Sequence, residues 1–263
     1  ISNKSVSKIL NQHKINTVIH CAAYSYVMDG ENNKKKYTKN NVQNTKKFIN
    51  ICKKNKIKNF IFLSSSNIYK DSNYKLAEKN RKLPINIYGK NKLEIENYLK
   101  KINFENYIIL RLFNVVGLIK KFHVFKFKKK NYQRLFFKII DNSSSLNLKY
   151  YIKNNLRLYP KRDFIDIRDL INIIFKILKT SKNKKINKTF NVGSGNAISI
   201  RNIINLFIRS NAKIKNLTTE IINSKELRNT NADINFAKYY FKWKPKVKIK
   251  DSVISTLKFS ILK

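Results

Sequence analysis

A tyrosine and a lysine four positions apart, Tyr88 and Lys92, are the residues of this sequence best placed to do chemistry. They follow Pro84 in a stretch with helical spacing, so we expect them one turn apart on the same helix face. A phenol is a poor base at neutral pH because its unperturbed pKa is about 10. An ammonium one turn away favours the phenolate and lowers this pKa, which makes the pair a candidate proton-transfer device. The alternative is a surface tyrosine beside one lysine among many, since the chain has 57 Lys and Arg residues.

The apolar pattern around this pair alternates between strands and helices. Unbroken apolar runs predict strands at 17–20, 60–63 and 107–110, and helical spacing predicts helices over 42–52 and 88–102. Apolar strands that alternate with helices are typical of a parallel sheet covered on both faces. In such sheets ligands bind at the carboxyl ends of the strands. Here these ends are Cys21–Ala23, Ser64–Ser66 and Phe113–Asn114.

The second half of the chain continues this alternation. After the stretch 162–166 we expect a helix over 170–178, a strand at 190–192 with a glycine turn, and a final helix through Ile261. One further helix has an inner face formed by Ile203, Ile204, Phe207 and Ile208. The stretch 120–130 is basic with interleaved phenylalanines, which fits either a nucleic-acid patch or a lysine-rich variable loop.

Composition bounds the class of protein. With 263 residues and 42% hydrophobic content, the chain can bury a globular core. The net charge of +42 is spread along the whole length, beside only five glycines and three prolines, so we interpret it as compositional bias and expect no nucleic-acid partner. Cys21 and Cys52 form neither a disulfide framework nor a metal-ligand spacing, which favours the cytoplasm and no metal. No signal segment or membrane-spanning run is present in the sequence.

Eight stretches together resemble one known family, and they cover nearly the whole chain. The family is that of the NAD-dependent epimerases and dehydratases, the extended short-chain dehydrogenases/reductases, and the resemblance is closest to the UDP-glucose and UDP-N-acetylglucosamine 4-epimerases. In family order, the stretches are Val18–Ala23, Asn40–Val42, Ser64–Tyr69, Tyr88–Lys92, Arg111–Gly117, Arg162–Ile165, Phe190–Gly195 and Trp243–Pro245.

The resemblance implies a site and a chemistry. Tyr88 is implied to be the base that takes the proton of the sugar 4-hydroxyl, with Lys92 lowering its pKa and holding the nicotinamide ribose, and Ser65 bonding the sugar O4. The cofactor is implied to be NAD, and the residues implied to contact it are Ala22, Ala23, Tyr24, Asn41, Tyr88, Lys92 and Phe113. The residues implied to bind the nucleotide sugar, most simply a UDP-sugar, are Ser65, Asn114, Arg162 and Arg228. A surface arginine is the alternative for Arg228.

The choice within the family rests on two positions. Dehydratases have an acid pair directly after the Ser65 equivalent, where this chain has Ser66 and Asn67, so we expect a simple 4-epimerase of polysaccharide synthesis. The resemblance also implies a homodimer that forms through the Tyr88 helix and the preceding helix. Two alternatives stay open: another NAD-linked nucleotide-sugar dehydratase or reductase of this fold, and a non-catalytic basic RNA-binding or scaffold member.

The largest departure from the family is at the beginning of the chain. The family's Gly-x-Gly-x-x-Gly turn has no equivalent, because Gly30 is the first glycine. About 50 to 60 residues, two βα units, are expected to be missing, so we expect a fragment that is inactive alone. The expected fold is α/β, a Rossmann-type doubly wound parallel sheet truncated at its N-terminus, with a smaller C-terminal α/β substrate-binding region. We expect the NAD-binding part at 1–117 and the sugar-binding part at 118–263, with about 162–192 returning to the former.

Overall fold

The computed structural model describes residues 3–102, 104–119, 135–141, 146–214 and 216–260. The described chain divides into two compact units. The first comprises 1–70, 77–112 and 176–191, and the second comprises 71–76, 113–175 and 192–263. The segment 176–191 belongs to the first unit, and the expected division of the chain by function stays a prediction. The basic stretch 120–130 lies outside the described residues.

The first unit is built on a sheet with the strand order β1-β2-β3-β8. Its strands are β1 (Thr17–His20), β2 (Asn59–Ser65), β3 (Asn106–Leu112) and β8 (Asn187–Val192). The β1–β2 and β2–β3 pairs are parallel, which confirms the predicted parallel α/β sheet. Strand β2 runs two residues further than predicted, through Ser65, so both serines belong to the strand end.

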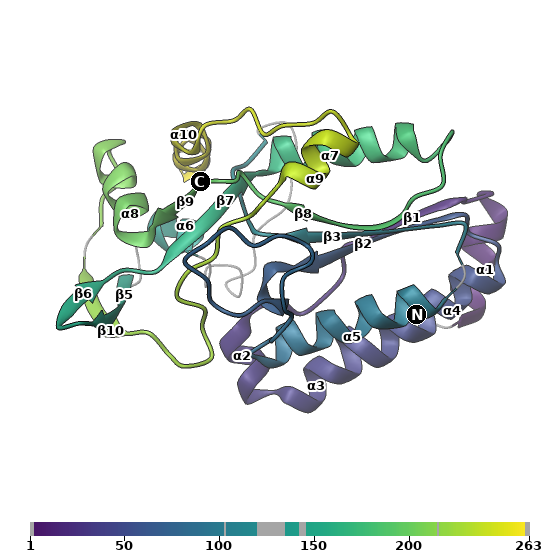
Figure 1. The fold of residues 1–263 in the computed structure, drawn as a ribbon, viewed down its shortest axis with the longest axis horizontal. Coiled ribbons are helices and arrows are strands. Elements are labelled where there is room, and N and C mark those ends of the chain that lie inside the picture. Colours follow the sequence, from purple (N-terminus) through teal and green to yellow (C-terminus); the bar gives the residue numbers. More distant parts are fainter. Residues whose placement is uncertain (1–2, 103, 120–134, 142–145, 215, 261–263) are drawn as a thin grey trace. The chain divides into compact units, whose positions relative to one another are not determined.

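Helices α4 (Thr45–Lys54) and α5 (Ile87–Lys101) cover one face of this sheet (Figure 1). The helices of this unit are α1 (Asn3–Gln12), α2 (Val27–Asn32), α3 (Lys34–Thr38), α4 (Thr45–Lys54) and α5 (Ile87–Lys101). A π-helical turn (Lys39–Asn44) joins α3 to α4, and a 3₁₀ turn (Ser66–Ile68) follows β2. The predicted helix over 42–52 is thus the second half of a longer, interrupted helix.

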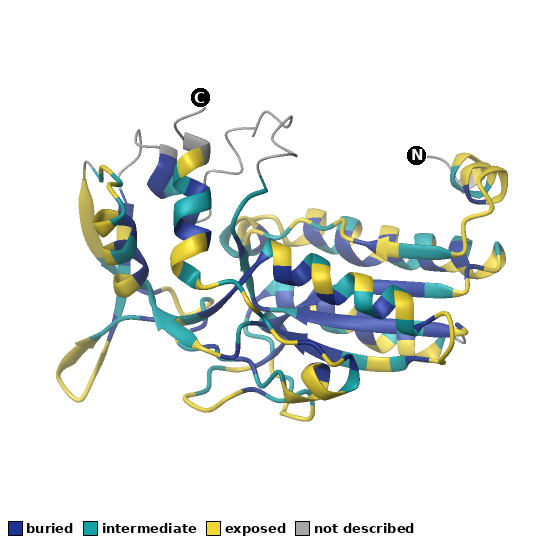
Figure 2. Ribbon diagram, turned by 90° about the horizontal axis from the view of Figure 1, so that it is seen from above, coloured by how far each residue is buried: buried dark blue, intermediate teal, exposed yellow. Residues whose placement is uncertain are grey.

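The core of the first unit contains a cluster of buried apolar side chains. Fully buried members from the sheet and its covering helices are Ile49, Cys52, Phe60, Ile95, Leu99 and Ile109. Figure 2 shows the strands of this sheet as largely buried, whereas the helices have exposed outer faces. Burying a side chain of this size contributes about 1.5–3 kcal/mol, so this face of α5 is held firmly against the strands.

The second unit contains two three-stranded sheets, with the orders β4-β7-β9 and β10-β5-β6. Its strands are β4 (Asn114–Val116), β5 (Leu146–Lys153), β6 (Leu156–Leu158), β7 (Lys161–Asp166), β9 (Ala197–Ser199) and β10 (Leu217–Ile221). Its helices are α6 (Leu135–Asp141), α8 (Ile200–Arg209), α9 (Asn235–Tyr240) and α10 (Ile249–Ser260). Helix α7 (Ile167–Thr180) begins in this unit and ends in the first.

The core of the second unit forms around α8. Ile203, Ile204 and Phe207 are buried, and the Phe207 ring meets that of Phe136 edge-on, with centroids 4.9 Å apart. The prediction that Ile208 lies on the inner face is wrong, because its side chain is 48% exposed. The packed stripe is centred on residues 203 and 207, which are one helical turn apart, so Ile208 falls beyond its margin. Among the described residues, no helix combines the length and apolarity needed to cross a membrane.

Candidate functional site

Helix α5 begins where two side chains satisfy its first backbone N–H groups. The side chain of Asn86 accepts a hydrogen bond from the Gly89 N–H at 2.8 Å, as an N-cap does. Glu31 Oε1 accepts another from the Ile87 N–H at 2.7 Å. An N-terminal cap of this kind contributes about 1 kcal/mol and fixes the first helical residue. The helix therefore starts at Ile87, and Tyr88 lies in its first turn, as predicted.

The first turn of α5 rests directly on the turn that follows β2. A Cβ atom placed on Gly89 would lie 2.1 Å from the carbonyl oxygen of Asn67, so only glycine permits this approach. The Asn86 amide also donates to the Asn67 side-chain oxygen at 3.1 Å. Tyr88 is thereby brought to the strand end that carries Ser65.

Lys92 connects the next turn of α5 to the same strand. Its side chain is buried, and Nζ donates to the Leu63 carbonyl at 2.6 Å. Nζ lies 5.8 Å from the centroid of the Tyr88 ring, so the ammonium and the phenol are neighbours. Burial lowers the pKa of Lys92 to about 8, an effect that Cys21 and Glu96 oppose. The predicted one-turn spacing of the pair is confirmed.

Ser65 has an oriented hydroxyl. It is buried, and its Oγ accepts hydrogen bonds from the Asn67 N–H at 3.2 Å and from the Asn67 Nδ2 at 3.3 Å. A hydroxyl oxygen has two acceptor lone pairs and one hydrogen. Because both donors of Asn67 approach the oxygen, the hydroxyl hydrogen points away from Asn67. Ser65 is therefore arranged as a donor toward another group.

Asn41 fixes the loop that follows β1. Its Oδ1 accepts from the Tyr24 N–H at 2.8 Å, and its Nδ2 donates to the Tyr24 carbonyl at 2.9 Å. Both ends of the Asn41 amide thus hold the backbone at one residue, and the π-helical turn brings the buried Asn41 to that loop. The loop residues Ala22 and Tyr24 are exposed, and Ala23 is half-buried. Asn41 shapes the loop from which the three predicted cofactor contacts come.

Sequence reasoning missed a buried ionic network behind the strand end. Glu96 and Arg111 are 0% and 1% exposed, and they form an ion pair with 2.7 Å between Arg111 Nη2 and Glu96 Oε2. Ser64 donates its hydroxyl to Glu96 Oε1 at 2.6 Å, and Arg111 donates to the Tyr69 hydroxyl at 2.7 Å. Two signals were available: Arg111 is a lone charge in an apolar strand, and Glu96 lies one turn beyond Lys92.

The predicted sugar-diphosphate residues lie in the second unit, around the beginning of β7. Arg162 is half-buried, and its guanidinium donates to the Arg228 carbonyl at 2.7 Å and to the Leu227 carbonyl. Burial lowers the pKa of Arg162 to about 10, so the group stays charged at neutral pH. Both arginines therefore lie at one place in this unit.

Asp163 organises the surroundings of Arg162. Its fully buried carboxylate accepts from the Ser194 N–H at 2.6 Å, the Gly195 N–H at 2.9 Å and the Ala232 N–H at 3.0 Å. Burial raises the pKa of Asp163, and these donors oppose that rise. The Asp163 carbonyl accepts from Asn114 Nδ2 at 3.2 Å, which places Asn114 beside β7.

Arg228 and Phe113 have different environments. Arg228 is exposed, its guanidinium lies 5.2 Å from the Tyr151 ring centroid, and its backbone N–H donates to Asp71 at 2.6 Å. This position suits both a ligand contact and the surface arginine that the sequence left as an alternative. Phe113 is buried, and its N–H donates to the Val192 carbonyl at 3.0 Å.

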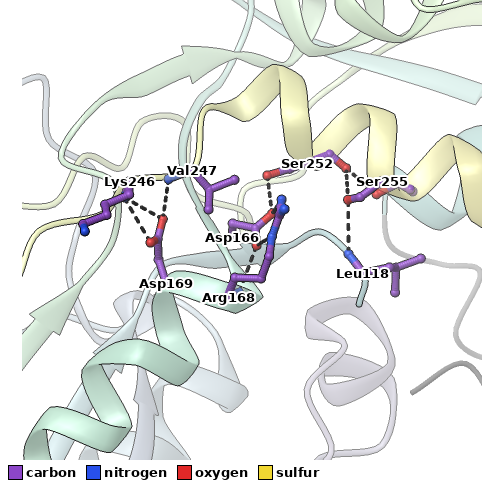
Figure 3. Close-up of polar contacts among 9 residues, drawn as sticks. Leu118, Asp166, Arg168, Asp169, Lys246, Val247, Ser252 and Ser255 are labelled. Atoms are coloured by element: carbon purple, nitrogen blue, oxygen red, sulfur yellow. Dashed lines mark hydrogen bonds and ion pairs between the residues drawn. The ribbon is translucent and has the colours of Figure 1, made fainter. Parts of the chain in front are cut away.

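The far end of β7 is tied to the C-terminal helix (Figure 3). Asp166 accepts from Arg168 Nε at 2.7 Å and from the Ser252 hydroxyl of α10 at 2.6 Å. Asp169 accepts from the backbone N–H groups at 246 and 247. Burial alone raises the pKa of Asp166, but the donors Arg168 and Ser252 outweigh it and lower the pKa below its usual value. The strand carrying Arg162 is therefore fixed at both ends.

Comparison with known proteins gives one family. The model of the NAD dependent epimerase/dehydratase family matches residues 1–193. A dTDP-4-dehydro-6-deoxyglucose reductase of Escherichia coli is 27% identical over 97% of this chain and 78% of its own length. A UDP-glucose 4-epimerase of Lactobacillus helveticus is 28% identical over 95% of this chain and 78% of its own length.

Solved structures agree with the fold. The crystal structure of UDP-glucose 4-epimerase from Bifidobacterium longum, in complex with NAD⁺ and UDP, superposes with a TM-score of 0.89. The match covers 99% of this chain and 81% of that chain at 19% identity. At this identity the likeness concerns the fold.

Proposed function

The chain belongs to the NAD dependent epimerase/dehydratase family, and from this premise we propose that it is a nucleotide-sugar 4-epimerase acting on a UDP-sugar. The observation that carries the proposal is the pair Tyr88 and Lys92. A buried ammonium 5.8 Å from the centroid of a tyrosine ring favours the phenolate of that tyrosine. The first turn of α5, which carries this tyrosine, packs on the turn that follows Ser65, and a phenolate there is a suitable base for a sugar hydroxyl.

In this proposal the residues of the first unit do the sugar chemistry. Tyr88 takes the proton of the 4-hydroxyl and later returns it, and Lys92 stabilises the tyrosinate. The hydroxyl of Ser65 donates to the sugar O4, supported by the two bonds from Asn67 that turn its hydrogen outward. NAD, when bound, would accept the C4 hydride and supply it back to the other face of the sugar.

The two residues after Ser65 favour epimerisation over dehydration. A 4,6-dehydratase must also move protons at C5 and C6, which requires groups that exchange protons near neutral pH. Ser66 is a hydroxyl and Asn67 is an amide, and neither titrates in that range. The Asn67 amide is moreover occupied by Ser65 and Asn86. This position therefore has no acid or base to offer.

The described residues fit one half of NAD. Lys92 supplies an ammonium, and the loop 22–24 places the exposed residues Ala22 and Tyr24 at the carboxyl end of β1, which suits the nicotinamide ribose. A pyrophosphate needs a glycine cradle at a helix N-terminus. In the described part of the first unit the glycines are Gly30 and Gly89, and each lies inside a helix. We therefore assign only the nicotinamide half to residues of this chain.

The second unit supplies the groups for the sugar diphosphate. Arg162 and Arg228 are guanidinium groups, and planar guanidiniums pair well with phosphate oxygens. The Arg228 carbonyl accepts from Arg162, so the Arg162 guanidinium lies against the backbone that carries Arg228. Asn114 offers an amide from the neighbouring strand β4. We assign diphosphate binding to these three residues.

A second candidate is reduction of a nucleotide-bound keto sugar. It is favoured by the similarity to the Escherichia coli dTDP-4-dehydro-6-deoxyglucose reductase, which extends over 97% of this chain. The two reactions differ in redox balance. An epimerase returns the hydride to the sugar and consumes no NADH, whereas a reductase oxidises one NADH for each product formed.

The experiment follows from this difference. The protein, produced together with any coding sequence that precedes Ile1, is incubated with NAD and either UDP-glucose or UDP-N-acetylglucosamine, and the sugar is analysed by proton NMR. The proposal expects the 4-epimer to accumulate to an equilibrium mixture, with NADH absorbance at 340 nm unchanged in bulk. Stoichiometric loss of added NADH with a 4-keto sugar, without epimer formation, would instead identify a reductase.

Two further expectations belong to this proposal. A homodimer through α5 and the preceding helix is expected, and light scattering of the eluted protein would show a mass near twice the 31.1 kDa of the chain. A cytoplasmic location is expected from the free cysteines, one exposed and one buried. Fractionation of the source cells would test it.

A further inference from the structure

We propose that Glu96 is a positioning residue, which locks the α5 face carrying Tyr88 and Lys92 in register with the strand end that carries Ser65. The roles of these three residues rest on the proposed function. The contacts that fix the register do not depend on it.

Three side chains form one stripe along α5. Tyr88, Lys92 and Glu96 follow each other at steps of four, so they lie on one face of the helix. Lys92 Nζ donates to the Leu63 carbonyl at 2.6 Å, and Glu96 Oε1 accepts from the Ser64 hydroxyl at 2.6 Å. Both contacts reach consecutive residues of β2, directly before Ser65. A slide of the helix by one residue would break both.

The carboxylate of Glu96 is itself held from the other side. Arg111 on β3 donates to it through Nε at 3.0 Å and through Nη2 at 2.7 Å, which is a two-pronged ion pair. Arg111 also donates to the Tyr69 hydroxyl at 2.7 Å, and Tyr69 donates to Asn191 at 2.8 Å. The Arg111 guanidinium thus connects β3 to α5 through Glu96 and to the turn after β2 through Tyr69. Tyr69 in turn connects this network to β8. The position of the Glu96 carboxylate is set by the sheet.

A fully buried ion pair is a costly way to gain stability, because apolar residues of similar volume pack equally well or better. Such a pair instead specifies the register of the helix against the strands, because its hydrogen bonds are satisfied in one register only. The same helix offers a comparison: Glu94 pairs with Lys46 at 2.6 Å, but these side chains are 48% and 34% exposed. The exposed pair can follow any small movement of α5, whereas the Glu96 pair cannot.

The test separates position from stability. We would compare Glu96→Leu, the double variant Glu96→Leu/Arg111→Met, and Glu94→Gln as the matched control on the same helix. The double variant removes both buried charges, so its thermal midpoint is expected to recover relative to Glu96→Leu. Its kcat for epimerisation is expected to stay lower than wild type by roughly 10- to 100-fold, with KM changed less than about threefold, because misplacement by 1 Å can cost about that much. Glu94→Gln is expected to match wild type.

A second readout needs no turnover. Lys92 is 4% exposed, whereas Lys90 on the same helix is exposed and serves as an internal reference. After brief acylation at a pH about two units above the Lys92 pKa of about 8, where its amine is deprotonated with or without Glu96, mass spectrometry gives the ratio of labelled Lys92 to labelled Lys90. The proposal expects this ratio to rise about tenfold in the double variant, despite its recovered stability, because a mispositioned α5 no longer shields the amine.

Two results would overturn the inference. If kcat returns to the wild-type value together with stability, or if the labelling ratio stays within about twofold of wild type, Glu96 is only structural and the inference is overturned. If the wild type, produced together with any coding sequence that precedes Ile1, turns over no nucleotide sugar, the proposed function fails. The labelling ratio then decides the positioning role alone.

Discussion

Replacing Gly89 by alanine tests how α5 is seated on the turn after β2. The added Cβ would lie 2.1 Å from the Asn67 carbonyl oxygen and 3.0 Å from the Pro84 Cβ. Non-bonded heavy atoms rest at about 3.5 Å, so the helix and the turn must separate by roughly 1 Å. Overpacking of this kind costs about 1–3 kcal/mol, whereas alanine in place of glycine gains about 0.5–1 kcal/mol inside a helix. The expected net loss of stability is about 1–2 kcal/mol.

The assay is denaturant unfolding of wild type, Gly89→Ala and Lys90→Ala, followed through helix content. Lys90 is exposed and adjacent, so its alanine variant is expected to stay within about 0.5 kcal/mol of wild type. Because Tyr88 precedes the substituted residue, kcat/KM should also fall, by up to about 100-fold for a displacement of 1 Å. An unfolding free energy for Gly89→Ala equal to or above that of wild type would refute the close approach.

The remaining predictions concern Asn41, Arg162 and Asp166. Asn41→Leu leaves the N–H and carbonyl of Tyr24 without their partner, so it should cost about 2 kcal/mol, measured by denaturant unfolding. Arg162→Lys removes the guanidinium fork while keeping the charge, and should raise KM for the UDP-sugar by about tenfold with kcat nearly unchanged. The pKa of Asp166 is lowered on folding, so its stabilisation is full above the ordinary value near 4 and is lost as the pH falls through the lower folded value. Unfolding at pH 6 and pH 3 should therefore show a gap of about 2 kcal/mol between wild type and Asp166→Asn that shrinks at the lower pH.

Periodicity predicted the elements of the first unit closely. Strand β1 has the expected bounds, and α5 differs by one residue at each end, because unbroken apolar runs and helical spacing are local signals. The interruption at Lys39–Asn44 was not predictable, because the π-helical turn accompanies a contact of Asn41 with Tyr24, which lies 17 residues earlier in the chain. The exposure of Ile208 was missed for a similar reason: spacing gives a face, but not how far the neighbouring element covers it.

Within the candidate site, only the contact between neighbours on the same helix could be predicted from the sequence. The spacing of Tyr88 and Lys92 places them together on any helix, so their proximity followed from the sequence. The pairing of Glu96 with Arg111 did not, because no sequence spacing gives the distance between a helix face and a strand on which it packs. Family resemblance supplied residue roles, and the contacts of the structure supply the reasons for the positions.

The most direct test of the account is epimerase turnover by wild type and Tyr88→Phe, both produced together with any coding sequence that precedes Ile1 and measured with UDP-glucose and UDP-N-acetylglucosamine in the presence of NAD. Phenylalanine keeps the ring next to the Lys92 ammonium but removes the hydroxyl that must carry the proton. A general base contributes about 10²- to 10⁴-fold, so kcat of Tyr88→Phe is predicted to fall by that factor, with the thermal midpoint nearly unchanged. Equal kcat in the two proteins would contradict the assignment of Tyr88 as the base, and with it the central claim.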